Sequence, residues 1–216
     1  MNRLGRILAS SIGKKLLMAV TGAAFLGFLC IHLAGNLTLY GGEDLFSSYV
    51  EHLHALGPFI PVAEWILVIL ALVHIGTGLL LFVQNLRARP RTYRVKRWAG
   101  GRTLGSATMP YTGILILIFV VFHLVDFHFA DRADTTLYSI VSLGFSNPLR
   151  VAIYVPAMVV VAIHVSHGFW SLFQTLGLNH PKYMGLLERL GIALSLVFGV
   201  GFGSIPLFIA LFAHGG

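Results

Sequence analysis

The chain has 216 residues, of which 56% are hydrophobic and only 11% are charged, and its mean hydropathy is +0.83. Soluble domains average about 25% charged residues, so this composition excludes an ordinary soluble protein and indicates an integral membrane protein. The formal net charge of +7 comes mostly from basic residues that flank apolar segments, and nothing in it supports binding to nucleic acid.

Five charge-free runs are long enough for a helix to cross a bilayer, which takes roughly 20 apolar residues. In chain order they are Leu16–Gly42, Trp65–Leu86, Thr103–Val125, Val151–Pro181 and Leu190–Gly216. We therefore expect an all-α integral membrane protein with one transmembrane domain over 1–216. Its expected helices span about 15–40, 60–86, 106–129, 149–174 and 187–212. The loop after the first run is compatible with a short amphipathic helix at Leu45–Leu56.

The basic residues predict the orientation, because cytoplasmic loops carry the excess of Lys and Arg. Only Arg132 and Arg150 fall on one side of the five spans. The other thirteen are Arg3, Arg6, Lys14, Lys15, Arg87, Arg89, Arg91, Arg94, Lys96, Arg97, Arg102, Lys182 and Arg189. We therefore expect a cytoplasmic N-terminus and an external C-terminus in the cell inner (cytoplasmic) membrane. Topology alone explains the basic face, which is equally suited to an acidic partner or to anionic lipid headgroups.

Four histidines lie inside the apolar runs, where ionisable residues are costly and usually functional. They are His32, His74, His123 and His164, and their spacing repeats: 42 positions separate the first two and 41 the last two. A Thr-Gly pair stands eleven and ten residues before the first histidine of each set, as Thr21-Gly22 and Thr112-Gly113. Each second histidine begins a His-x-x-x-Gly motif. The first four helices are therefore predicted to form two parallel copies of a two-helix unit, roughly 15–90 and 105–175, followed by a fifth helix.

The depth of the histidines predicts how they pair. At about 1.5 Å of rise per residue, His32 lies about 25 Å beyond Lys15, which places it in the outer half of the membrane with His123. His74 lies about 20 Å before Arg87 by the same rise, and His164 belongs to the inner half. Depth thus pairs His32 with His123 and His74 with His164, and each pair draws one histidine from each unit.

Two neutral imidazoles from different helices can fill both axial positions of a haem iron. Such a centre has no open position for oxygen chemistry and transfers electrons, and two centres at two depths form an electron route across the membrane. Each histidine alone is equally explained as a hydrogen-bonded core residue, a proton relay or a metal ligand. Zinc or non-haem iron favours ligands clustered at one depth, often with carboxylates, and Asp126 is the one strong carboxylate candidate within the spans.

Four motifs, in order, carry a family resemblance that covers about residues 10–212. They are FLCIHLAGN at 28–36, VHIGTG at 73–78, Thr112-Gly113 with Phe122-His123, and IHVSHGFWS at 163–171. The segments SIGKK at 11–15 and FSSYVEHLHALG at 46–57 are also typical. The chain resembles the cytochrome b membrane anchor of succinate:quinone oxidoreductases, in the single-polypeptide, five-helix, dihaem form found in succinate dehydrogenases and quinol:fumarate reductases of respiratory chains.

The resemblance implies a role for each of these residues. His74 and His164 would be the iron ligands of a proximal haem b, near a cytoplasmic iron–sulfur subunit, and His32 and His123 those of a distal haem b. A menaquinone-type quinone would react near the distal haem, with Glu51 as the external acid for proton transfer. The chain would thus be one subunit of an enzyme complex. Dicarboxylate chemistry, as in the tricarboxylic acid cycle, would belong to a separate FAD-containing flavoprotein subunit.

One position departs from the family. Some dihaem members carry a glutamate two residues before the fourth histidine, implicated in transmembrane proton movement, and this chain has Ala162 there. Two other functions remain open from the residues. One is a haem-free, proton-coupled membrane carrier, and the other is a haem-bearing anchor without its own quinone site.

Overall fold

The structure is a computed structural model that describes residue 6 and residues 9–88, 104–133 and 135–212. The described residues form helices and turns without any strand. Five helical segments are long and apolar enough to cross a membrane, so the expected all-helical, multi-pass architecture is confirmed. The five helices that carry them are α2 (Ser11–Asn36), α4 (Phe59–Ala88), α5 (Leu104–His123), α7 (Pro148–Thr175) and α8 (Pro181–Phe212).

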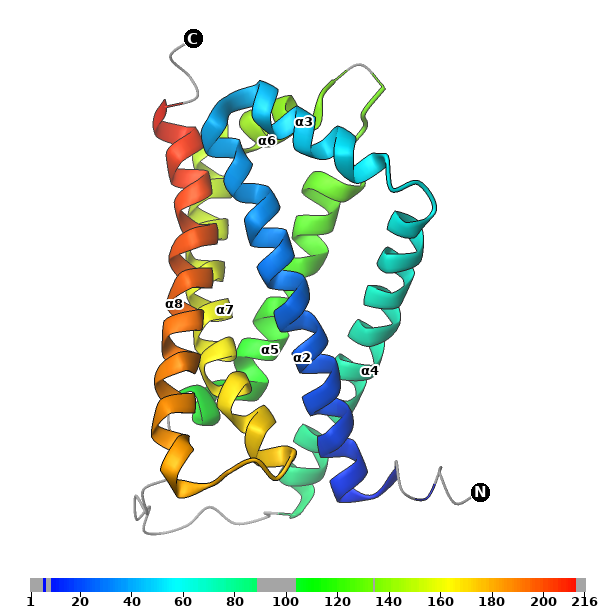
Figure 1. The fold of residues 1–216 in the computed structure, drawn as a ribbon, viewed down its shortest axis with the longest axis vertical. Coiled ribbons are helices and arrows are strands. Elements are labelled where there is room, and N and C mark those ends of the chain that lie inside the picture. The colour runs from blue at the N-terminus through cyan, green and yellow to red at the C-terminus, as the bar shows by residue number, and fades with distance from the viewer. Residues whose placement is uncertain (1–5, 7–8, 89–103, 134, 213–216) are drawn as a thin grey trace.

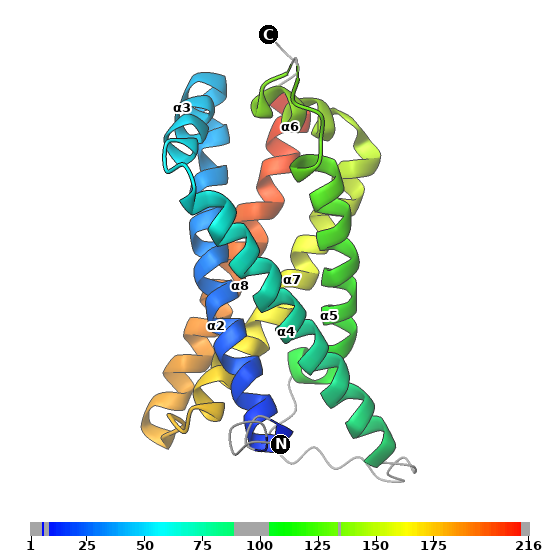
Figure 2. The ribbon, with the colours of Figure 1, turned by 90° about the vertical axis from the view of Figure 1, so that its right-hand side faces the viewer.

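The five long helices run side by side, and two short helices lie across one end of the bundle (Figure 1). The short helices are α3 (Gly42–His54) and α6 (Leu137–Ser146). α7 packs along α8 and α5, whereas α2 contacts both α4 and α7. α4 is the most peripheral helix: it crosses the bundle obliquely in Figure 2, and none of its residues is buried. Its exposed apolar surface suits contact with lipid.

The buried core has two parts. One lies at the end that carries α3 and α6, and the other lies further along α2, α7 and α8. The first comprises Leu39, Phe46, Val141, Phe145, Tyr154, Ile205 and Ile209. The second comprises Leu33, Met158, Val161, Val165 and Phe198. Both α7 and α8 contribute to the two parts, so the packing between these two helices connects them.

The helices extend beyond the charge-free runs. α2 begins at Ser11 instead of near 15, because the Ser10 hydroxyl accepts a hydrogen bond from Gly13 N at 3.0 Å and caps the first turn. α8 begins at Pro181, six residues before the expected start. Hydropathy marks the part of a helix that lies in the membrane, and charged turns such as those at Lys14 and Lys182 continue the helix into water.

Three short elements, η1, η2 and α6, lie at the end of the bundle that carries α3. A 3-10 turn, η1 (Leu37–Gly41), leads from α2 into α3, which covers most of the expected amphipathic segment. A π-helical turn, η2 (Leu124–His128), prolongs α5. α6 was not expected from the sequence. It starts where the Thr136 hydroxyl accepts a hydrogen bond from Ser139 N, and its ten residues are too few to span a bilayer.

The described charges are separated between the two ends. Lys14 Nζ donates to Gln84 Oε1 at 2.8 Å, which joins the start of α2 to the last turns of α4 at the basic end. Glu43 lies at the other end, where its carboxylate accepts from the Thr136 hydroxyl at 2.9 Å. Residues 89–103, which make up most of the basic connector after α4, lie outside the described residues, as do Arg3 and Asp134.

Candidate functional site

His74, on α4, is held against α2 by a hydrogen bond. Its Nδ1 lies 2.9 Å from the Thr21 hydroxyl oxygen, and the Phe25 ring stands edge-on to the imidazole with its centroid 5.6 Å away. Thr21 is almost fully buried. The position of the ring is therefore fixed by residues one turn apart on the neighbouring helix.

His164, on α7, makes the equivalent contact with α5. Its Nδ1 lies 3.1 Å from the hydroxyl oxygen of Thr112, which is also buried. The His164 side chain lies close enough to His74 for an electrostatic interaction between them. These are the two histidines that depth pairs in the inner half, and each is fixed to a threonine of the preceding long helix.

Each ring also faces the glycine that follows its threonine. A Cβ atom added at Gly22 would meet His74 Cε1 at 3.6 Å, and one added at Gly113 would meet His164 Cε1 at 3.5 Å. Four residues after each histidine the correspondence continues, since Gly78 faces the Met18 side chain and Gly168 faces that of Met109. The threonine, glycine and methionine contacts between α2 and α4 therefore have counterparts between α5 and α7.

The second pair, His32 on α2 and His123 at the end of α5, is in direct ring contact. The two ring centroids are 5.9 Å apart, and the two ring planes are nearly perpendicular. Phe28 and Phe202 flank His32, and Phe119 flanks His123, with ring centroids 5.1–5.9 Å away. Thr21 and His32 are eleven residues apart, so the two pairs are separated by about 16 Å along α2.

The second pair has weaker polar support than the first. His123 Nδ1 is buried and has no hydrogen-bond partner. His32 Nδ1 lies 3.4 Å from the Asn36 amide nitrogen, at the long limit of a hydrogen bond, and that amide donates instead to the His32 carbonyl at 2.8 Å. A buried nitrogen without a partner is unusual and is consistent with a ring whose surroundings are completed by a ligand.

A buried ionic network adjoins His123. Asp126, on η2, is 7% exposed; its Oδ1 lies 3.2 Å from Arg150 Nη2, and its Oδ2 accepts from the Tyr154 hydroxyl at 3.0 Å. The Tyr154 ring lies 6.1 Å from the His123 ring, centroid to centroid. The carboxylate that the sequence singled out is therefore neutralised by its neighbours and does not reach the histidine pairs as a free ligand.

Glu51 lies on α3, apart from the four histidines. Its side chain is exposed and lines a cavity of about 180 Å³ between α3 and α6. The other lining residues are Phe46, Ser47, Val50, Thr136, Leu137 and Tyr138. This cavity is at the end of the bundle nearer to the His32–His123 pair.

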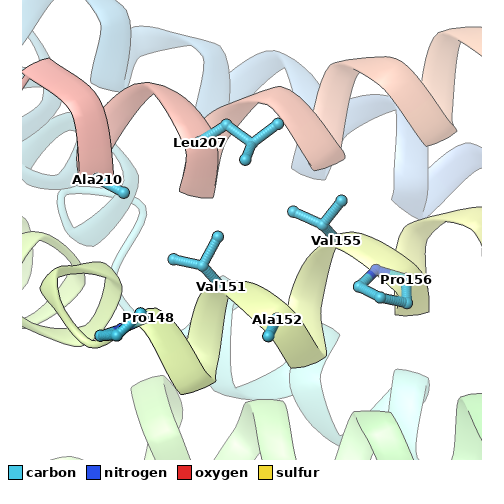
Figure 3. Close-up of a pocket in the computed structure, with 7 residues that line it drawn as sticks. All are labelled: Pro148, Val151, Ala152, Val155, Pro156, Leu207 and Ala210. Atoms are coloured by element: carbon cyan, nitrogen blue, oxygen red, sulfur yellow. The ribbon is translucent and has the colours of Figure 1, made fainter.

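A larger groove, of about 470 Å³, lies between α7 and α8 (Figure 3). It is lined by Pro148, Val151, Ala152, Val155, Pro156, Leu207 and Ala210. These side chains are all apolar and offer no metal ligand or proton-transfer group, so we do not assign the candidate chemistry to this groove.

The two histidine pairs fit haem better than they fit zinc. Two imidazoles bonded to opposite sides of one metal ion at about 2 Å have ring centres roughly 6 Å apart, close to the 5.9 Å between His32 and His123. Zinc takes three or four protein ligands, whereas no three His, Cys, Asp or Glu side chains converge in the described part of the chain. The donor set therefore suits a group that brings its own equatorial ligands.

Two further residues of α7 flank His164. Ala162 faces α8, where a Cβ added at Gly199 would lie 3.0 Å from the Ala162 Cβ. A longer side chain at 162 would have to displace this close helix contact. His167 Nδ1 is buried and unpartnered, and its ring stands edge-on to Trp170 at 4.9 Å.

No protein family model, curated protein or solved structure matches this chain. The assignment of a function therefore depends on the residues and their geometry alone.

Proposed function

We propose that this protein is the dihaem cytochrome b membrane anchor of a succinate:quinone oxidoreductase, either a succinate dehydrogenase or a quinol:fumarate reductase. One observation carries the proposal. The Thr–His hydrogen bond and its glycine and methionine neighbours occur twice, between α2 and α4 and again between α5 and α7. Histidines that only fill the core have no reason to repeat these contacts, so we interpret the first four long helices as two copies of one ligand-binding unit.

Each pair would hold one haem b. When bound, a haem held by two histidines would supply one-electron transfer. His74 and His164 would be the ligands of one haem, and His32 and His123 those of the other. Phe25, on α2, and the aromatic rings that flank the second pair supply the apolar walls that keep water away from the ligands.

The proposed direction of electron transfer runs along the bundle. The basic end, with Lys14 and the end of α4, would face the cytoplasm and receive the iron–sulfur subunit, which would join the FAD flavoprotein that performs the dicarboxylate chemistry. The opposite end would face outward. There Glu51 lines the cavity between α3 and α6, and it would exchange protons with a menaquinone-type quinone near the His32–His123 pair.

The proposal is tested by measuring haem per polypeptide in the purified complex, together with the optical spectra of single variants. We expect about two haems in the wild type. His123→Ala should lose only the haem nearer to Glu51, and His74→Ala only the haem nearer to the basic end. His52→Ala is the matched control, because its ring is exposed and bonds its own helix at Ser48 O, and it should retain both haems.

Two results would overturn the proposal. A folded wild-type chain with no bound haem would favour a haem-free carrier. If His123→Ala lost the haem nearer to the basic end instead, the histidines would pair differently from the proposal.

A further inference from the structure

We propose that Thr21 and Thr112 are positioning residues that hold His74 and His164 in the tautomer protonated at Nδ1. Nε2 of each ring would then carry the lone pair that a metal requires. The tautomer follows from hydrogen-bond accounting in the chain itself, and its role in binding haem rests on the function proposed above.

The two hydroxyl groups lie where an unpaired polar atom is costly. Thr21 is 4% exposed and Thr112 is 6% exposed. Buried polar groups in proteins are almost always hydrogen-bonded, so every donor and acceptor around these hydroxyls has to be assigned.

Each threonine hydroxyl has one proton, and it donates that proton in a hydrogen bond to a carbonyl oxygen of its own helix. The Thr21 oxygen lies 2.7 Å from Leu17 O, and the Thr112 oxygen lies 3.0 Å from Met109 O. A carbonyl oxygen can only accept, and two oxygens this close would repel each other without a proton between them. Both hydroxyls therefore donate to their own helix and keep only lone pairs for the histidine.

The ring nitrogen must consequently be the donor in both pairs. His74 Nδ1 donates to the Thr21 oxygen at 2.9 Å, and His164 Nδ1 donates to the Thr112 oxygen at 3.1 Å. A neutral imidazole has one N–H, so Nε2 is unprotonated in both rings. A hydrogen bond at the far nitrogen also fixes the ring orientation and raises the basicity of the ligating nitrogen.

The His32–His123 pair lacks this support. Asn36 offers its amide to His32 Nδ1 only at 3.4 Å, and His123 Nδ1 has no partner. The threonines thus distinguish the two pairs, and removing them should change the His74–His164 pair while leaving the other pair unaltered.

The first experiment measures the tautomer directly. Full-length, haem-free protein labelled with ¹⁵N-histidine is reconstituted in lipid, and the ring nitrogens are assigned by solid-state NMR. We expect His74 and His164 to show a protonated Nδ1 and a bare Nε2. An Nε2–H signal from either ring would overturn the assignment, whether or not the protein binds haem.

The second experiment compares Thr21→Val with Thr21→Ser in the assembled complex, and Thr112 in the same way. Valine keeps the branched shape and removes the acceptor, whereas serine keeps the hydroxyl. We expect valine to weaken binding of the haem at the His74–His164 pair about 10–100-fold, as is typical when a partner of a metal ligand is lost. It should also raise the midpoint potential of that haem, because a less basic ligand stabilises ferric iron less. Serine should restore both values.

Ser195→Ala is the control. Ser195 is equally buried, but its hydroxyl donates within α8, to Ile192 O at 2.7 Å, and α8 carries no histidine. Wild-type affinity and potential in both valine variants, with two haems bound, would reject the threonine role and leave the proposed function standing. A wild type without haem would reject the proposed function, and the NMR result would still decide the tautomer.

Discussion

At the scale of single residues, the end of the bundle with α3 and α6 is organised around one buried carboxylate. Asp126 is paired with Arg150, which is 38% exposed, and with the Tyr154 hydroxyl. Tyr154 is itself enclosed by rings from α5, η2 and α6, with Phe119 and Phe145 both 5.0 Å away by ring centroid. A buried charge in a membrane protein persists only when it is paired, so this network couples the end of α5 to the start of α7.

Tyr154→Phe should therefore destabilise the protein. The substitution leaves the aromatic packing in place and removes a hydrogen bond to a charged group, which contributes about 1.5–3 kcal/mol. The free energy of unfolding in detergent is the quantity to measure. Tyr111→Phe, at an exposed position on α5, should leave it nearly unchanged, and equal effects of the two substitutions would contradict this account.

At the scale of helices, the sequence predicts the spans and misses the elements that lie across their ends. The charge-free runs locate the five long helices because length and apolarity are sufficient to define a span. α6 is apolar but has only ten residues, and it is stabilised by its Thr136 cap and by contacts with α8 that no local pattern reveals. The turn η2 likewise has no distinct local signal.

The candidate site could be predicted in part, for similar reasons. Repetition along the chain singles out His32, His74, His123 and His164, and it also marks Thr21 and Thr112. The role of the threonines was missed, because their hydroxyls contact histidines more than fifty residues away. Pairing by depth needs only helical rise, whereas a hydrogen bond between helices needs their rotation about their own axes.

Close packing between α5 and α7 gives a prediction at this scale. A Cβ atom added at Gly105 would lie 2.7 Å from His167 Cβ and 3.2 Å from Ile163 O. Gly105→Ala should thus force the two helices apart and cost about 1–3 kcal/mol, the usual effect of overpacking. Thermal unfolding in detergent measures the change.

Gly185→Ala provides the matched control, because a Cβ at this exposed position of α8 meets nothing within 4 Å. Alanine is the better helix former by about 1 kcal/mol, so this variant should be as stable as the wild type or more stable. Destabilisation by Gly185→Ala comparable to that by Gly105→Ala would mean that crowding is not the cause.

At the scale of the whole molecule, the separation of charge between the two ends predicts how the protein sits in the membrane. Lys14 and Arg87 belong to one end, and Glu43 and Glu51 belong to the other, together with α3 and α6. The positive-inside rule predicts that the first end is cytoplasmic. The proposed quinone cavity and the proposed surface for an iron–sulfur subunit would then lie on opposite sides of the membrane.

Cysteine labelling tests this orientation. In a Cys30→Ser background, Glu51→Cys should react with a membrane-impermeant maleimide added to spheroplasts, because its site is exposed and is predicted to be external. Arg87→Cys should react only after the membrane is permeabilised. The reverse labelling pattern would contradict the proposed topology, because the proposed surface for the iron–sulfur subunit would then be external.

The spacing of the two histidine pairs along α2 has an energetic consequence for a living cell. A distance of about 16 Å is roughly half of the 30 Å hydrocarbon layer. If the pairs hold the proposed haems, an electron that hops between them would cross about half of the transmembrane voltage. A full crossing changes the energy of a unit charge by about 2.3 kcal/mol per 100 mV, and the hop by about 1.2 kcal/mol. An energised membrane would therefore favour one direction of this transfer over the other by about eightfold per electron for every 100 mV.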